Sequence, residues 1–394
     1  MVDSLRLNLA NVPKELKLII KMLRENNECT TKEEFQHIDW DLFLTLTKHH
    51  RIYPLLHKKL KDIDPSLIPP QVVQDLSLAY KRNTFQMLQL SGEMEQMNTI
   101  FSNEKISVLF LKGPVIADDL YGDISLRTSN DLDVLIPLNQ LEKAENILVE
   151  LGYVKDDYIE TILGDWTWRH HHTCFIHPQK KIKVELHWRL NPGPSIEPSF
   201  QEMWGRKRKS NLTNSPVYLL GKEDLFLFLV SHGARHGWSR LRWLVDIKQL
   251  LKQDLDCNLV EKFFKKYHHL NVGGQAIILA TCILKSPVPI YAQFLTQEKK
   301  SLKLAQESIF YLERMVNLHT DPVPIEVSTY HQKHLYSLMS WKQKVLFILS
   351  FLFPYPEDAK TLPLPKPLHF LYFPLRPFLW AWRKYGIPIY PRGN

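Results

Sequence analysis

The chain has 394 residues, and its hydrophobic fraction of 44% is ample for a packed globular core. Its formal net charge is +8, from 50 Lys and Arg against 42 Asp and Glu, which permits anionic partners without choosing among them. The longest apolar run, residues 345–353, is about half of the ~20 residues that a membrane-crossing helix needs, so a transmembrane class is excluded.

Cysteine usage and the first residues bear on the cellular compartment. The four cysteines, Cys29, Cys174, Cys257 and Cys282, lie far apart and form neither a CxxC pair nor a disulfide framework. Residues 1–18 carry charges throughout and contain no apolar core of the kind found in signal peptides. We therefore expect a cytoplasmic protein.

The first part of the chain has a helical pattern. Leu16, Ile19, Ile20 and Leu23 recur at helical spacing, and residues 72–101 contain no proline. We expect an N-terminal helical region over residues 1–104.

A different pattern begins after this region. Residues 106–113 form a compact apolar run that ends in glycine, as a buried strand does, and residues 131–136 form another. The other elements expected before residue 190 are helices at 114–121 and 139–152 and strands at 172–178 and 181–188. This order predicts an α+β fold, in which a small mixed sheet at residues 105–190 lies between N-terminal and C-terminal helical regions.

The rest of the chain divides into two parts. Helical spacing returns at Glu223 and predicts a C-terminal helical domain over residues 215–340, in which "SHGARHGW" (231–238) fits a turn between helices or the lining of a cleft. Residues 341–394 are rich in proline and aromatic residues, so we expect no long regular elements there. The prediction is a C-terminal strap over the helical domain, with peripheral membrane contact through its aromatics as the alternative.

Three carboxylates fall in the predicted sheet. In "NDLDVLI", Asp131 and Asp133 share one face of a strand, and they repel each other unless a cation lies between them. Glu185 interrupts the apolar strand "KIKVELHW", where it is either a third acid of the same site or an acid at an exposed strand edge or paired with Lys183. His187 shares its face, and it orients Glu185, contacts a substrate or has only a structural role.

This set of acids predicts phosphoryl chemistry. Mg²⁺ prefers oxygen ligands and usually binds through one or two carboxylates together with substrate phosphate oxygens. In a two-metal arrangement, one ion activates the attacking oxygen and the other stabilises the leaving pyrophosphate. Three acids on neighbouring strands are enough for two Mg²⁺ ions.

The motifs "LKGPVIADDLYGDISLRTSNDLDVLI", "VELHWRL" and "RWLVDIKQLL" resemble the uncharacterised bacterial nucleotidyltransferases, a family of the polymerase-beta-like nucleotidyltransferase superfamily. The resemblance covers residues 111–251 well and the flanking helices more loosely. It implies transfer of a nucleoside monophosphate from an NTP to an acceptor, with release of pyrophosphate. It also implies that Asp131 and Asp133 are the paired metal-binding aspartates and that Glu185 is the third catalytic and metal-binding acid.

The glycine motif of the superfamily, a Gly-Ser pair, is replaced by "LKGP", and 17 residues separate its glycine from the first aspartate. Lys112 is expected to bind phosphate as a point charge, and Arg127 is expected to do so as a bidentate fork. Gly113 and Ser129 complete the expected nucleotide-binding set.

Several alternatives stay open. The acceptor is a small molecule, a sugar or peptide intermediate, or a protein, and the sequence does not choose among them. Nucleic acid is not expected, because the basic run at 205–210 has no interleaved aromatics. No zinc site is expected at histidines 170–172, because the Cys and His residues around them do not have the spacing of a four-ligand site. The rival functions are a non-catalytic module that binds nucleotide or a partner, and a membrane-peripheral scaffold.

Overall fold

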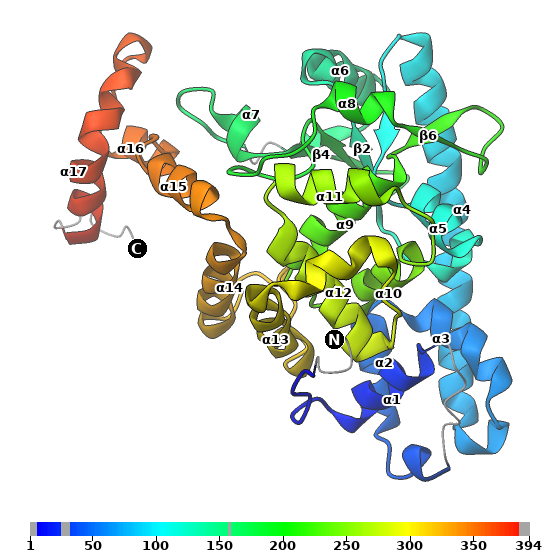
Figure 1. Ribbon diagram of the computed structural model, residues 1–394. Coiled ribbons are helices and arrows are strands. Elements are labelled where there is room, and N and C mark those ends of the chain that lie inside the picture. The colour runs from blue at the N-terminus through cyan, green and yellow to red at the C-terminus, as the bar shows by residue number, and fades with distance from the viewer. Residues whose placement is uncertain (1–5, 25–31, 157–158, 386–394) are drawn as a thin grey trace, which may run out of the picture.

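The computed structural model describes residues 6–24, 32–156 and 159–385, so Cys29 lies outside the described residues. It confirms the expected α+β class, because a mixed seven-stranded sheet lies among helices (Figure 1). Helical regions precede and follow the sheet in the sequence.

The region before the sheet is helical. Its longest element is α4 (Pro70–Asn103), which runs through Gly92 and buries a stripe that includes Leu76, Met87 and Met94. The Asn83 side-chain amide on this helix donates to the carbonyl oxygen of Ser125 at 2.8 Å, which fixes the loop that leads to the central strand. The other elements of the region are α1 (Lys14–Met22), η2 (Lys32–Phe35), α2 (Trp40–His49), α3 (Tyr53–Lys59), η3 (Leu60–Asp62) and η4 (Pro65–Leu67).

The sheet has the strand order β3-β4-β5-β2-β1-β7-β6. Its strands are β1 (Leu109–Phe110), β2 (Asp131–Leu135), β3 (Val154–Asp156), β4 (His172–His177), β5 (Ile182–His187), β6 (Arg208–Ser210) and β7 (Val217–Leu219). The sequence pattern does not identify the short strand β3. The sheet also extends past the predicted 105–190 core, because β7 pairs in parallel with β1 and β6 pairs with β7.

Helices connect and cover these strands. Between the first strands lie α5 (Pro114–Tyr121), η5 (Ile124–Leu126), η6 (Leu138–Gln140) and α6 (Leu141–Glu150), and between the later strands lie α7 (Trp166–Arg169) and α8 (Phe200–Gly205). Strands β2 and β5 are parallel neighbours at the centre of the sheet. Four completely buried apolar residues of these two strands, Leu132, Val134, Val184 and Leu186, share one face, because side chains alternate along a strand. The opposite face carries the acids.

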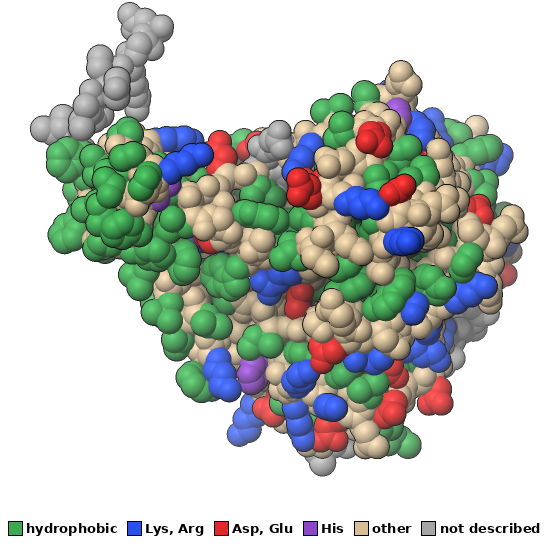
Figure 2. Space-filling view, turned by 90° about the horizontal axis from the view of Figure 1, so that it is seen from above, with side chains coloured by type: hydrophobic (Ala, Val, Ile, Leu, Met, Phe, Trp, Pro, Cys, Tyr) green, Lys and Arg blue, Asp and Glu red, His purple; other side chains and the backbone are tan. Residues whose placement is uncertain are grey.

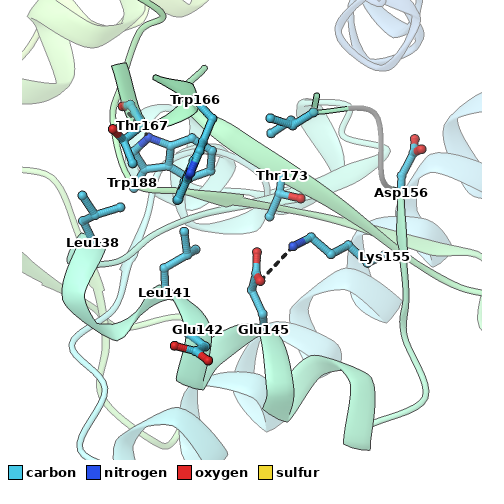
Figure 3. A pocket seen from close by; sticks show the side chains of 11 residues that line it. Leu138, Leu141, Glu142, Glu145, Lys155, Asp156, Trp166, Thr167, Thr173 and Trp188 are labelled. Carbon is cyan, nitrogen blue, oxygen red and sulfur yellow. Dashed lines mark hydrogen bonds and ion pairs between the residues drawn. The ribbon is translucent and has the colours of Figure 1, made fainter. Parts of the chain in front are cut away.

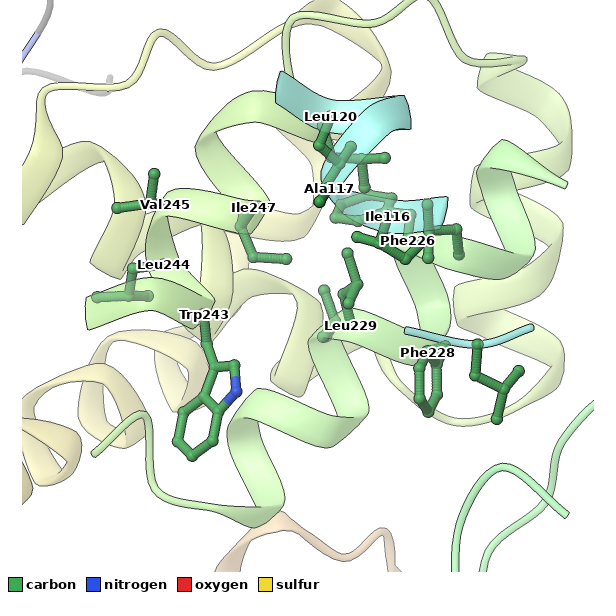
Figure 4. Close-up of a cluster of buried hydrophobic side chains, with 14 of the residues drawn as sticks. Ile116, Ala117, Leu120, Phe226, Phe228, Leu229, Trp243, Leu244, Val245 and Ile247 are labelled. Atoms are coloured by element: carbon green, nitrogen blue, oxygen red, sulfur yellow. The ribbon is translucent and has the colours of Figure 1, made fainter. Parts of the chain in front are cut away.

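The helical domain after the sheet contains α9 (Lys222–Arg235), α10 (Leu241–Leu250), α11 (Cys257–Lys266), α12 (Leu270–Leu284), η7 (Ile290–Gln297), α13 (Lys299–Glu313) and α14 (Ile325–Leu338). A buried cluster joins it to the sheet region: Ile116 and Leu120 of α5 lie among Phe226 and Leu229 of α9 and Ile247 of α10 (Figure 4). This packing places the ends of α9 and α10 over the acid-bearing face.

Gly233 near the end of α9 permits the close packing of the turn between α9 and α10. A Cβ atom at Gly233 would lie 2.3 Å from the ring of Trp238, whose side chain is completely buried. Only glycine allows the indole to approach the helix backbone this closely. The "SHGARHGW" segment is therefore the end of α9 and the turn after it, and the side chains of His232, Arg235 and His236 line a cavity.

The last described residues differ from the prediction. They form α15 (Trp341–Ser350), α16 (Pro356–Thr361), η8 (Lys366–Leu371) and α17 (Tyr372–Tyr385), although no long regular element is expected there. Helix α17 tolerates two prolines because Pro374 lies in the first turn, where the N–H has no partner within the helix, and Pro377 removes only one later hydrogen bond.

These helices project from the body instead of covering the helical domain as a strap (Figure 1). Their contacts with the sheet region include the stacking of Phe353 on Trp168, with ring centroids 6.3 Å apart, and of Arg169 on Tyr355 at 4.5 Å. Among the described residues, none of the helices has the combination of length and apolar character that crossing a bilayer requires.

Candidate active site

The parallel pairing of β2 and β5 brings the predicted acids together. Asp133 lies directly opposite Glu185 in the strand register, and Asp131 lies opposite Lys183, so all four side chains share one face of the sheet. Because β5 lies between β2 and β4, Glu185 is at the centre of the sheet and not at an exposed edge. The three predicted acids therefore belong to one site.

Asp133 lies at the bottom of this site, with no exposed surface. Its Oδ1 atom is 2.7 Å from the Lys112 ammonium and 3.2 Å from Nε2 of His187, whereas its Oδ2 atom is buried without a hydrogen-bond partner. Burial would raise the pKa of Asp133, but the Lys112 charge and the His187 hydrogen bond hold it below its ordinary value. Asp133 is thus a buried carboxylate that favours its ionised form and keeps one oxygen without a partner among the described residues.

Glu185 is surrounded by basic groups. Its carboxylate is 2.7 Å from Lys183 Nζ, 3.5 Å from His187 Nε2 and 3.9 Å from His172 Nε2. Burial opposes ionisation, but the hydrogen bond with His187 and the charge of Lys112 lower the pKa of Glu185 far below its ordinary value. The same two carboxylates raise the pKa of His187 despite its complete burial. His187 therefore links Asp133 to Glu185.

Asp131 lies at the start of β2, near the glycine motif. Burial and the neighbouring Asp133 charge raise the pKa of Asp131, which is the electrostatic cost that the sequence pattern predicts. The Ser129 hydroxyl donates to the Asp131 backbone carbonyl at 3.1 Å and lies 3.3 Å from its carboxylate. Gly113 precedes α5 with φ +79°, a conformation that favours glycine, and its Cα faces the same Asp131 carbonyl. Gly113 and Ser129 thus lie beside the first aspartate.

Arg127 has a different environment from the one predicted. Only 2% of its surface is exposed, and its Nε and Nη2 atoms both bind the carboxylate of Asp246 on α10, at 3.0 Å. Tyr121 donates to the same carboxylate at 2.7 Å. Arg127 therefore anchors α10 to the loop before β2, and its Nη1 atom alone has no partner within the described residues.

A cavity of about 620 Å³ opens over the acids. Its wall carries seven lysine and arginine side chains from the described residues: Arg51, Lys112, Arg127, Lys183, Arg235, Arg240 and Arg242. The acids Asp131 and Glu185 also line it. The acids thus lie on the sheet side together with Lys112 and Lys183, whereas the arginines come from the surrounding helices and loops.

Four of these arginines have no described carboxylate partner within salt-bridge distance: Arg51, Arg235, Arg240 and Arg242. Burial lowers the pKa of Arg235 and Arg240 to about 10, and that of Arg242 to about 9. Buried charge without a counter-charge is costly, and the Nε atoms of Arg235 and Arg242 have no partner among the described residues, although other nitrogens of these groups donate to His171 and Thr128. An anion with several acceptor oxygens would relieve this cost.

The sequence pattern does not reveal the arginines that line the cavity from the helical domain. Arg235, Arg240 and Arg242 lie more than forty residues after Glu185, on a turn and two helices whose position over the sheet depends on the fold. The sequence does contain several arginines and histidines between residues 231 and 242. The expectation that residues 231–238 line a cleft includes only some of them. Trp243 also lines the cavity, and its indole N–H is buried without a partner.

The histidines form a cluster that their spacing does not reveal. His171 and His172 lie at the start of β4, and His187 on the adjacent strand completes a group whose ring nitrogens lie within 4.8 Å. However, the Nε2 atom of His171 is already 3.2 Å from Nη1 of Arg235, which donates to it. Burial and the nearby charge of His187 lower the pKa of His172 to about 3. His171 and His172 are therefore neutral bases that line the cavity wall, whereas His187 favours its protonated form.

The acid face fits a divalent cation. Asp133, Glu185 and His187 each offer a ligand atom within 4.8 Å of the others, and Asp133 keeps one buried oxygen unused. Asp131 stands on the same face but outside this tight group. Carboxylate oxygens suit Mg²⁺ and Mn²⁺.

A separate cavity of about 610 Å³ lies on the opposite face of the sheet, between α6 and β4 (Figure 3). Trp166 and Trp188 form one side of it, and Glu145 pairs across it with Lys155 at 2.8 Å. The sheet separates this space from the acids, because Thr173 and Glu185 project from opposite faces. It is therefore not part of the candidate active site.

The basic run at 205–210 is engaged in internal contacts. Arg206 pairs with Asp224 at 2.7 Å, Arg208 pairs with Asp119 at 2.5 Å, and Lys207 lies over the ring of Trp204 at 4.2 Å. These contacts attach β6 and the turn before it to the body of the protein.

A family model described as an uncharacterised nucleotidyltransferase matches residues 36–285, more than half of the chain, and this span contains the sheet, α9 and α10. No curated protein and no solved structure matches.

Proposed function

Because the chain belongs to the uncharacterised nucleotidyltransferase family, we propose that it transfers a nucleoside monophosphate from an NTP to an acceptor and releases pyrophosphate. The observation that carries the proposal is the division of one cavity into an acid face and a wall of unpaired arginines. A triphosphate needs cationic partners, and phosphoryl transfer needs metal-binding carboxylates beside them.

The acids have distinct roles in this proposal. Asp133 and Glu185 hold Mg²⁺, with Asp131 as the further carboxylate on the same face. Bound Mg²⁺ supplies charge that polarises the transferred phosphoryl group and stabilises the leaving pyrophosphate. The low pKa of Glu185 favours metal binding over proton abstraction, because a weakly basic carboxylate gives little driving force for taking a proton. We keep two Mg²⁺ ions as part of the proposal.

The cations bind and orient the nucleotide. Arg51, Arg240 and Arg242 approach the cavity from the α2–α3 connection and the start of α10, and they neutralise phosphate oxygens. Lys112 pairs with Asp133 and also lines the cavity in which we place the phosphates. A small movement of its flexible side chain lets it contact a phosphate oxygen instead of Asp133. Arg127 contributes only its free Nη1 atom, since its other nitrogens bind Asp246.

Calorimetry and a product assay test the proposal together. ATP, GTP, CTP and UTP are titrated with Mg²⁺ into the wild type and into a variant with Asp131→Asn and Asp133→Asn, and pyrophosphate release is then measured with cell extract as the source of acceptor. We expect metal-dependent binding of at least one NTP and pyrophosphate release that the variant loses. Failure of every NTP to bind, in a wild type that unfolds cooperatively, would refute the proposal.

A second candidate is a non-catalytic nucleotide-binding module of the same fold. It is favoured by one observation: Lys112 and Lys183 already pair with Asp133 and Glu185, at 2.7 Å each. In such a module the lysines replace the metal, so nucleotide binds without Mg²⁺ and no pyrophosphate appears. Titration in the presence of EDTA separates the two functions.

A further inference from the structure

The C-terminal arm, residues 341–385, consists of α15, α16, η8 and α17 and stands apart from the globular body (Figure 1). It holds 14 of the 26 large hydrophobic side chains that are exposed in the described part of the chain. Figure 2 shows them gathered as one green surface at the end of the molecule where the arm lies. A surface of this kind marks an interaction site more often than chance exposure.

Helix α15 has the reverse of the ordinary burial pattern. Its two buried residues are polar, Gln343 and Ser350, while Trp341 is 72% exposed and Ile348 is 56% exposed. Residues 341, 345, 348 and 352 are all exposed and apolar, at the spacing of one helical stripe. A helix with polar residues inside and apolar residues outside is not built to face water.

The second half of the arm repeats this pattern. Asp358 is completely buried and pairs with Arg376 at 2.6 Å and with Arg383 at 2.7 Å. On the surface of α17, Phe378 is 72% exposed and Trp382 is 57% exposed. The arm thus satisfies its polar groups internally and presents its apolar groups outward, as a structure in contact with lipid must do.

The charge of the arm indicates which kind of partner covers its apolar surface. Residues 341–385 contain seven lysines and arginines against two acids, a net charge of +5. Cations lie beside exposed aromatics, as shown by Lys384 over Trp380 at 4.8 Å and Lys342 over Trp341 at 5.8 Å. Amphipathic aromatics and long cationic side chains are typical of the membrane interface. A second copy of the arm would bring like charges together, whereas an anionic lipid surface complements them.

We propose that the C-terminal arm docks the protein on the surface of an anionic lipid bilayer. The exposed aromatic and aliphatic side chains of α15 and α17 enter the headgroup region and the lysines bind lipid phosphates, while the helices lie in the plane of the membrane without crossing it. This inference goes beyond the proposed function, because it concerns residues outside the acid site and holds whether or not the protein turns over nucleotide.

Vesicle flotation with the full chain tests the proposal. Vesicles of phosphatidylcholine alone are compared with vesicles of equal parts phosphatidylcholine and phosphatidylglycerol, at low and high salt. The test variant carries Trp341→Ser, Ile348→Ser, Phe378→Ser and Trp382→Ser. The matched control carries Phe85→Ser, Leu88→Ser, Ile290→Ser and Ile325→Ser, four comparably exposed positions on the body.

The wild type and the control are expected to float with the anionic vesicles, and to do so less at high salt. The partition coefficient of the arm variant should fall at least tenfold, since each apolar side chain that is buried in lipid contributes about tenfold. A second variant, with Lys342→Gln, Lys344→Gln and Lys384→Gln, should lose binding to anionic vesicles only, by about fivefold per charge. Equal flotation of the arm variant and the wild type, or binding of the wild type to neither vesicle, overturns the proposal. Light scattering tests the alternative that the arm binds a second copy of the chain. A wild type that is dimeric and binds no vesicles, together with an arm variant that is monomeric, overturns the proposal in favour of that alternative.

Discussion

The buried pair of Arg127 and Asp246 yields the sharpest stability prediction. The pair is hidden from solvent, with 2% and 0% of the two residues exposed, and Tyr121 donates a further hydrogen bond to the same carboxylate at 2.7 Å. Replacing Asp246 with alanine leaves a buried guanidinium without its counter-charge, which costs about 3–5 kcal/mol. The loss of an acceptor for Tyr121 adds roughly 1–3 kcal/mol. This is a large part of the ~5–15 kcal/mol that usually stabilises a domain.

Urea unfolding followed by circular dichroism measures this loss. We expect Asp246→Ala to lower the free energy of unfolding by at least about 3 kcal/mol. The double variant Arg127→Met with Asp246→Leu should be more stable than Asp246→Ala alone, because an apolar pair removes both buried charges. A single variant within about 0.5 kcal/mol of the wild type would refute the reasoning, since it would mean that the guanidinium finds other partners.

The double variant also separates two roles of Arg127. If Arg127 is only an anchor for α10, the double variant keeps its affinity for NTP. If the free Nη1 atom binds phosphate, as the position of Arg127 before Asp131 predicts, the affinity falls by about tenfold while the fold is preserved.

Three further predictions follow from the charges of the site and the core. Lys112→Ala should weaken NTP binding in calorimetry by about tenfold, and an unchanged affinity would exclude its role on phosphate. Arg242→Gln should raise the melting temperature of the ligand-free protein, because it removes an unpaired buried charge, yet lower the affinity for NTP; a lower melting temperature would contradict this account. Burial lowers the pKa of His50 and His269 in the folded state, so the unfolded state binds protons more readily. Stability should therefore be fully present above pH 6.5 and decrease as the pH falls below it, and urea midpoints that do not change between pH 7.5 and pH 5.5 would contradict the assignment of neutral histidines.

Local patterns predicted the acid face because its geometry is local. Alternation along a strand places Asp131 and Asp133 together, and the apolar run around Glu185 indicates a central strand. The partners of these acids could not be predicted in this way. The position of Arg235 over the sheet depends on the packing of α9 on α5, and the pairing of Arg127 with Asp246 joins residues 119 positions apart. No sequence period encodes contacts at such a separation.

The C-terminal residues show a different limit of pattern reading. Prolines predict the end of a helix only where the lost N–H would have had a partner, and Pro374 in the first turn of α17 has none. The internal ion pair of Asp358 then fixes α16 against α17. Proline content alone therefore predicted an irregular strap where the chain forms helices.

The distribution of charge in the cavity also limits which ligand can satisfy it. A metal ion alone would neutralise Asp133 and Glu185 but would leave Arg240 and Arg242 unpaired on the opposite wall. A phosphate compound alone would pair with the arginines but would bring further negative charge toward two ionised carboxylates. A complex of a divalent cation with a polyphosphate neutralises both sides together, because the cation meets the acids while the phosphate oxygens meet the guanidinium groups. The separation of acids on the sheet from bases on the helices therefore supports a metal-bound nucleotide as the proposed substrate.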